Sequence, residues 1–163
     1  MKYHNITKDD MLNGDGLRVV LWVSGCEHGC NQCHNQFTWN PNDGLDFDEH
    51  AKKEIFDLLD KDYISGITFS GGDPLYPSNR EEIGKLINEI KQTYPHKTIW
   101  LYTGYDYEQI SDLDFIKNID VLVDGKFIIQ LFDPQLHWKG SANQRVIDVQ
   151  ATLSLGKIVL HTN

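Results

Sequence analysis

Residues 66–103, "GITFSGGDPLYPSNREEIGKLINEIKQTYPHKTIWLYT", decide the fold class. Apolar runs at 66–70 and 98–103 are typical of buried strands, and the stretch between them has helical periodicity. Ser78 and Glu81 stand in capping-box register at its start. A strand, a helix and a strand in this order predict two parallel strands joined by a right-handed crossover. One helical face carries the apolar side chains Ile83, Leu86, Ile87 and Ile90.

The same pattern extends outward in both directions. Apolar runs at 18–24 and 119–125 predict two more strands, and residues 46–63 predict a helix with Asp46 and Glu49 as a capping box. A shorter helix is expected over 106–118, and one or two further strands after residue 126. The sequence therefore predicts an α/β protein, 1–163 as a single domain, with five or six mostly parallel strands.

Composition narrows the classes of function. The chain has 15 Lys and Arg against 24 Asp and Glu, a net charge of −9 that disfavours binding to nucleic acid or to anionic membrane surfaces. No apolar run approaches the roughly 18 to 20 residues of a membrane span, and the polar start "MKYHNITKDD" has no signal-peptide core. We therefore expect a cytoplasmic protein whose partners are small molecules or another protein.

All three cysteines lie in "SGCEHGCNQCHN", residues 24–35, directly after the first predicted strand. Incidental core cysteines are disfavoured, because the flanking residues are polar or glycine. A zinc site could add His28 or His34, but no second pair of ligands follows. An iron–sulfur cluster held by Cys26, Cys30 and Cys33 would leave one iron open for a reacting molecule, as catalytic metals require.

The spacing Cys-x3-Cys-x2-Cys resembles that of radical S-adenosylmethionine (SAM) enzymes. Further segments in the same order resemble the glycyl-radical activases of anaerobic ribonucleoside-triphosphate reductases, over about residues 13–145. About eighteen residues after that carry no motif of the family. The matching segments are "NGDGLRVVLWVSGCEHGCNQCHNQFTW", "GITFSGGDPLYP", "IWLYTGY", "VLVDGKF" and "WKGSANQR".

This resemblance implies an open, partial (βα) barrel of the radical SAM type. It implies an enzyme that reductively cleaves SAM at a [4Fe–4S] cluster and uses the 5′-deoxyadenosyl radical to make a glycyl radical on the class III reductase. The implied partners are the large subunit of that reductase and an electron donor such as a flavodoxin-like protein. An activase of another glycyl-radical enzyme and a non-catalytic zinc-binding interaction module remain as alternatives.

The resemblance also implies site residues, with no catalytic side chain because the cofactors carry the chemistry. Cys26, Cys30 and Cys33 would hold the metal cluster, and "SGGDP" would contact the SAM amino group. Arg18 and Arg145 match the family pattern but receive no physical assignment. The implied cofactor-binding residues are Gln32, Cys33, His34, Ser70, Gly71, Gly72, Asp73, Thr103, Asp124 and Lys126.

Overall fold

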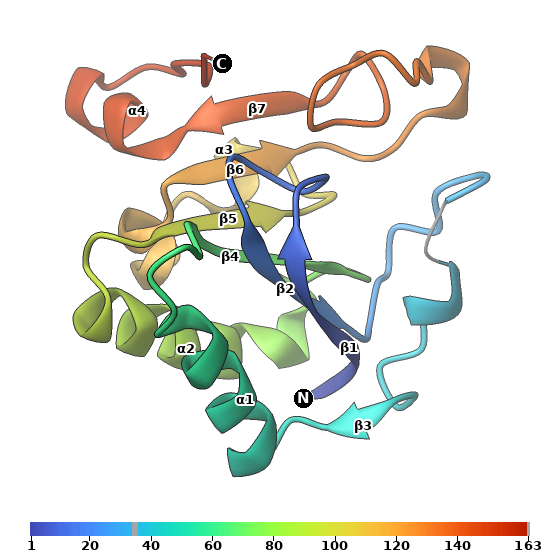
Figure 1. The fold of residues 1–163 in the computed structure, drawn as a ribbon. Coiled ribbons are helices and arrows are strands. Elements are labelled where there is room, and N and C mark those ends of the chain that lie inside the picture. The colour runs from blue at the N-terminus through green and yellow to red at the C-terminus, as the bar shows by residue number, and fades with distance from the viewer. Residues whose placement is uncertain (34–35, 163) are drawn as a thin grey trace.

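The computed structural model describes residues 1–33 and 36–162. Seven strands in these ranges form one open mixed sheet in the order β3-β1-β2-β4-β5-β6-β7, with β3 and β7 at its two edges (Figure 1). The strands are β1 (Lys2–Asp10), β2 (Arg18–Val23), β3 (Leu45–Asp46), β4 (Gly66–Gly71), β5 (Thr98–Tyr102), β6 (Val121–Asp124) and β7 (Arg145–Asp148).

Four α-helices and four 3₁₀ helices accompany the sheet in the described residues, and Figure 1 shows α1 and α2 on the same side of it. None of these helices combines the length and apolar character needed to cross a bilayer. The helices are α1 (Glu49–Leu59), α2 (Arg80–Thr93), α3 (Tyr107–Ile110), α4 (Val149–Leu155), η1 (Gln36–Thr38), η2 (Pro77–Asn79), η3 (Asp114–Asn118) and η4 (Ile129–Leu131).

The centre of the sheet is parallel and its flanks are antiparallel. β2, β4, β5 and β6 run parallel, which confirms the four predicted strands and the α/β class. The expectation of a mostly parallel sheet is wrong, because β1, β3 and β7 all pair antiparallel. β1 carries the polar sequence "KYHNITKDD", whose half-exposed side chains hide the strand from a search for apolar runs.

Both predicted capping boxes are wrong. α1 is capped by Asp48, whose side chain accepts a hydrogen bond from the Ala51 backbone N–H at 3.0 Å, while Asp46 lies in β3. α2 follows the 3₁₀ turn η2, which begins at Pro77 and includes Ser78. Its N-cap residue, Asn79, makes no side-chain cap and instead donates to the Ser24 backbone oxygen at 2.8 Å. That contact ties the start of α2 to the start of the cysteine loop.

Two other parts of the chain differ from expectation. The predicted helix at 106–118 is split into α3 and η3, because Leu113 between them is extended. After β7 the chain forms α4, which the sequence did not predict, and then returns to the sheet. The backbone N–H groups of Asp148 and His161 donate to Val159 and Val146 across this return. The residues without a family motif therefore extend and cover the β7 edge.

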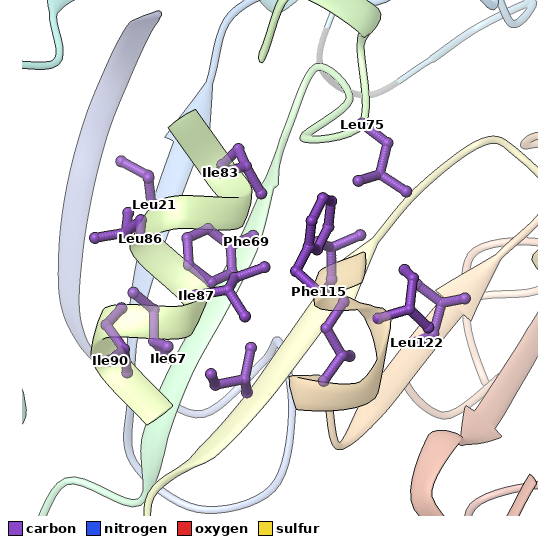
Figure 2. Packing of buried hydrophobic residues seen from close by; sticks show 14 of the residues in the cluster. Leu21, Ile67, Phe69, Leu75, Ile83, Leu86, Ile87, Ile90, Phe115 and Leu122 are labelled. Carbon is purple, nitrogen blue, oxygen red and sulfur yellow. The ribbon is translucent and has the colours of Figure 1, made fainter. Parts of the chain in front are cut away.

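The main core lies between the sheet and the helices α1 and α2. The apolar face predicted for α2 is confirmed, since its four side chains are at most 3% exposed. Figure 2 shows this face of α2 against the side chains of β2 and β4, including Leu21, Ile67 and Phe69. Alternate strand residues point to the other face of the sheet, where Trp100 of β5 and Val121 and Val123 of β6 form a smaller apolar cluster. That other face is the one available for a ligand.

Candidate active site

The cysteine loop leaves the end of β2 and closes on itself. The backbone N–H groups of Gly25 and Cys26 donate to the carbonyls of Thr38 and Trp39, at 2.7 and 3.1 Å. Figure 1 shows the loop on the side toward which the arrowheads of β4 and β5 point. The loop therefore lies at the carboxyl end of a central parallel strand, the usual position of a ligand site in α/β proteins.

The three cysteines are half-buried thiols within this loop. Burial raises the pKa of Cys26 to about 11 and also raises the pKa of Cys30. Opposing this, backbone N–H groups of His28 and Phe127 donate to the sulfurs of Cys26 and Cys30, respectively. The positive charge of Lys126, an exposed residue, also lowers the pKa of Cys30. Such N–H donors would stabilise thiolates once a metal binds.

The Gly-Gly turn after β4 packs directly against the start of the cysteine loop. Gly71 has φ +108°, and a Cβ built on Gly72 would lie 2.5 Å from the carbonyl oxygen of Gly25. The Gly72 N–H donates to Val23, and the Asp73 N–H donates to Gly25 at 2.6 Å. Glycine is required here because the two backbones touch.

Asp73 and Thr103, from the ends of β4 and β5, meet in a buried hydrogen-bonded cluster. The Asp73 carboxylate is 1% exposed and accepts from the Thr103 hydroxyl at 3.0 Å, the Gly104 N–H at 2.9 Å and the Leu75 N–H at 2.8 Å. It also pairs with the His28 ring at 2.6 Å. This carboxylate therefore joins the cysteine loop to two strand ends.

Asp124, at the end of β6, is held by the motif "GSANQR". Its carboxylate is 1% exposed and forms a bidentate pair with Arg145, at 3.1 Å to Nε and 2.6 Å to Nη2. It also accepts from the Tyr107 N–H at 2.8 Å. Arg145 extends the pair to the exposed Glu108, and hydrogen bonds to both carboxylates raise the pKa of Arg145. The structure thus gives Arg145 the physical role that its sequence did not reveal.

A cavity of about 520 Å³ opens on the face of the sheet opposite the helices. It brings together two of the predicted residues, Cys33 and Ser70, with Trp22 and Tyr102 from neighbouring strands. The segment 127–144 forms much of its wall. A larger cavity, of about 590 Å³, involves Ser65 and Thr98 at the opposite ends of β4 and β5 and is lined by none of the predicted residues.

The other predicted residues that the structure describes do not line the cavity of about 520 Å³. Gln32 is exposed at a turn with φ +56°, and His34 lies outside the described residues. Thr103 and Asp124 are engaged in the buried pairs above. Arg18, left without an assignment, is fully buried at the amino end of β2, far along the strand from the cysteines. Its guanidinium donates to the hydroxyls of Thr68 and Thr98 and to three backbone carbonyls. Arg18 therefore stabilises the sheet.

Sequence reasoning missed two organising side chains. His28 was considered only as a zinc ligand, although its place between two cysteines was visible. Gln144 accepts at Oε1 from the backbone N–H groups of Gly140 and Ser141, and donates from Nε2 to the carbonyl of Gly125. It therefore shapes the segment that walls the cavity, and its place within "GSANQR" was the available signal.

These features fit a three-cysteine cluster, because half-buried thiols, N–H donors to sulfur and a close-packed glycine turn occur together. Within residues 1–33 and 36–162, no group of three or more His, Cys, Asp or Glu is close enough to hold a metal ion. The assignment of Cys26, Cys30 and Cys33 as ligands therefore stays a prediction.

Comparison with known proteins identifies the family. A family model described as "4Fe-4S single cluster domain" matches residues 12–147. The chain is 48% identical over 146 residues to the anaerobic ribonucleoside-triphosphate reductase-activating protein of Enterobacteria phage T4, covering 90% of this chain and 93% of that protein. The proteins of that name from Escherichia coli K12 and Vibrio cholerae are 43% and 42% identical, covering 90% and 88% of this chain and 97% and 96% of theirs. The chain belongs to the family of anaerobic ribonucleoside-triphosphate reductase-activating proteins.

Proposed function

We propose that this chain is a radical SAM enzyme that activates an anaerobic, class III ribonucleoside-triphosphate reductase. The observation that carries the proposal is the match to activating proteins over 90% of the chain, which spans the cysteine loop, the Gly-Gly turn and "GSANQR". When bound, the [4Fe–4S] cluster and SAM would supply reductive, one-electron cleavage of a carbon–sulfur bond and abstraction of a hydrogen atom from a reductase glycine.

The chain's own residues hold and shield these cofactors. Cys26, Cys30 and Cys33 would bind three irons, and the N–H groups directed at the sulfurs would stabilise the bound thiolates. Gly71 and Gly72 let the backbone at the end of β4 approach the cluster loop closely. The cavity of about 520 Å³ lies within the range of small-molecule sites, and we assign it to SAM.

The other predicted residues would support the cofactor site from its surroundings. In the sequence, Gln32 and His34 flank Cys33, the last of the three proposed ligands. The positive charge of Lys126 lowers the pKa of Cys30. Ser70 would contact SAM from the wall of the cavity. Asp73, Thr103 and Asp124 would shape the strand ends around SAM, because their buried hydrogen bonds fix those ends.

The sheet suits a substrate that is itself a protein. We propose that residues 1–163 form a single domain and that its sheet is a partial, open (βα) barrel, because β3 and β7 stand at opposite ends of the strand order and do not pair with each other in the described residues. An open barrel leaves room for a glycine-bearing segment of the reductase large subunit to approach the cavity. A flavodoxin-like electron donor and a cytoplasmic location complete the proposal, since reduced thiols need a reducing compartment.

Replacing one ligand tests the cluster directly. Anaerobically reconstituted protein should contain about four irons and four sulfides per chain and should cleave SAM when reduced. Cys30→Ala should lose cleavage by at least about 100-fold, because its iron loses a protein ligand. Reductase activation, measured as deoxynucleotide formed after pre-incubation with SAM and reductant, should fall in parallel. The exposed His50→Ala serves as the matched control.

Two results would contradict this proposal. Full SAM cleavage by Cys30→Ala would remove that cysteine from the ligand set. Reconstituted protein that binds one zinc ion, holds no iron and leaves SAM intact would instead support the zinc-binding module.

A further inference from the structure

His28 has a buried side chain within the cysteine loop. It lies between Cys26 and Cys30 in the sequence, yet its side chain is only 4% exposed. The ring reaches across to the ends of β4 and β5, where Nε2 lies 2.6 Å from Oδ2 of Asp73. The described part of the cysteine loop is therefore attached to the sheet through a side chain as well as through its backbone.

The hydrogen bonds around Asp73 fix the direction of this contact. Oδ2 of Asp73 also accepts from the Thr103 hydroxyl and the Gly104 N–H, and Oδ1 accepts from the Leu75 N–H. An ionised carboxylate can only accept hydrogen bonds, and three donors already surround Asp73. The His28 ring therefore donates its Nε2–H to Asp73, and such a bond to a charged acceptor is about twice as strong as a neutral one.

Two neighbouring residues pack closely against the ring. Tyr105 packs edge-on against His28, with 4.6 Å between ring centroids. Gly104 lies against the ring so closely that an added Cβ would be 2.4 Å from Cδ2 of His28. Asp73, Thr103, Gly104 and Tyr105 thus form a socket, which we call the His28 socket.

The position of the ring excludes simpler roles. With Nε2 bonded to Asp73 and the side chain almost fully buried, the ring is poorly placed to meet a substrate from solvent. The His28 backbone N–H, by contrast, donates to the sulfur of Cys26. Holding the ring in its socket therefore also holds the donor to a predicted cluster ligand.

We propose that His28 is a positioning residue, whose ring locks the cysteine loop to the ends of β4 and β5 and so sets the geometry of the cluster ligands. This inference rests on the proposed function only in calling the loop a cluster site. The contact between His28 and Asp73 involves only residues of this chain, so its effect can be measured in the cofactor-free protein.

Side chains of different length can distinguish the effect of the hydrogen bond to Asp73 from the effect of the ring's size. In His28→Gln the amide nitrogen stands as many bonds from Cα as Nε2 of histidine, so it can still donate to Asp73. In His28→Asn the donor stands one bond short, and His28→Ala has none. The exposed His50→Ala on α1 is the control for loss of a histidine.

Hydrogen exchange of the full cofactor-free chain is the first readout. Amides of residues 26–33 should exchange about tenfold faster or more in His28→Ala and His28→Asn, because a charge-assisted bond is lost. His28→Gln should remain closer to wild type. Exchange within α2 should not change, which shows that the rest of the chain is folded. Equal exchange of residues 26–33 in wild type and His28→Ala would overturn the proposal, as would a His28→Gln that is as fast as His28→Ala.

A second substitution tests the socket without touching either partner of the bond. Gly104→Ala should push the ring out and speed exchange of the loop as His28→Ala does. In the His28→Ala background it should add little, because no ring is left to displace. Full additivity of the two changes would contradict the socket.

The reconstituted protein gives the readout for the cluster. His28→Ala and His28→Asn should lose iron to a chelator faster than wild type and should alter the electron paramagnetic resonance spectrum of the reduced cluster. An unchanged spectrum and rate of iron loss would overturn the positioning role. If wild type forms no cluster while His28→Ala still loosens the loop, the proposed function fails and the anchoring contact stands.

Discussion

At the scale of single residues, two buried carboxylates organise the ends of the central strands. Asp73 joins β4 and β5 to the cysteine loop, and Asp124 joins β6 to Arg145. The sequence identified both aspartates through resemblance but not their partners. The side-chain partners His28 and Thr103 of Asp73 and Arg145 of Asp124 lie 45, 30 and 21 positions away in the chain, and such pairings are set by the packed fold rather than by local pattern.

Removing Arg145 should leave the buried Asp124 carboxylate without its ion-pair partner, with only the Tyr107 N–H still donating to it. Arg145→Leu should therefore lower the free energy of unfolding by about 2 to 3 kcal/mol. This loss is smaller than that expected for a fully buried ion pair, because Arg145 is partly exposed to solvent. Urea unfolding of the cofactor-free chain measures this. Glu108→Gln, at the exposed end of the same network, should cost under about 1 kcal/mol. Equal losses of unfolding free energy in the two variants would show that the burial of Asp124 does not determine how much the ion pair stabilises the fold.

At the scale of elements, periodicity predicted the middle of each large element better than its ends. The apolar runs located β2, β4, β5 and β6, and the four-residue apolar face located α2. The caps failed because Asp46 joins the short strand β3 and because Pro77 starts a 3₁₀ turn. The starts of α1 and α2 depend on how the preceding residues pair and turn in the fold. A search for capping residues in the local sequence does not contain that information.

The start of α1 gives a direct test of the corrected cap. Asp48→Ala should lower the free energy of unfolding by about 1 kcal/mol, because the Ala51 N–H loses its acceptor. Asp46→Ala should cost clearly less, since its contact is a salt bridge with Lys2 at the surface. Thermal or urea unfolding of both variants decides between the two caps. A larger loss in Asp46→Ala would restore the cap predicted from sequence.

At the scale of the whole molecule, the two faces of the sheet have different tasks. One face is packed against α1 and α2 by the main core. The other carries the cavity with Cys33 and Ser70, walled by the segment that "GSANQR" closes. The cysteine spacing and the Gly-Gly turn were visible in the sequence because their chemistry is local. A strand after residue 126 was expected and is confirmed by β7, but its antiparallel direction was not expected. β1, β3 and α4 were not visible either, because polar or short elements depend on their neighbours.

The most direct measurement is electron paramagnetic resonance of the partner reductase after anaerobic incubation with this chain, SAM and a one-electron reductant. A glycyl radical on the reductase is expected with wild type and with His50→Ala, and none with Cys30→Ala or without SAM. A glycyl radical of equal yield with Cys30→Ala, or no radical with a fully reconstituted wild type that cleaves SAM, would contradict the proposed activation of the reductase.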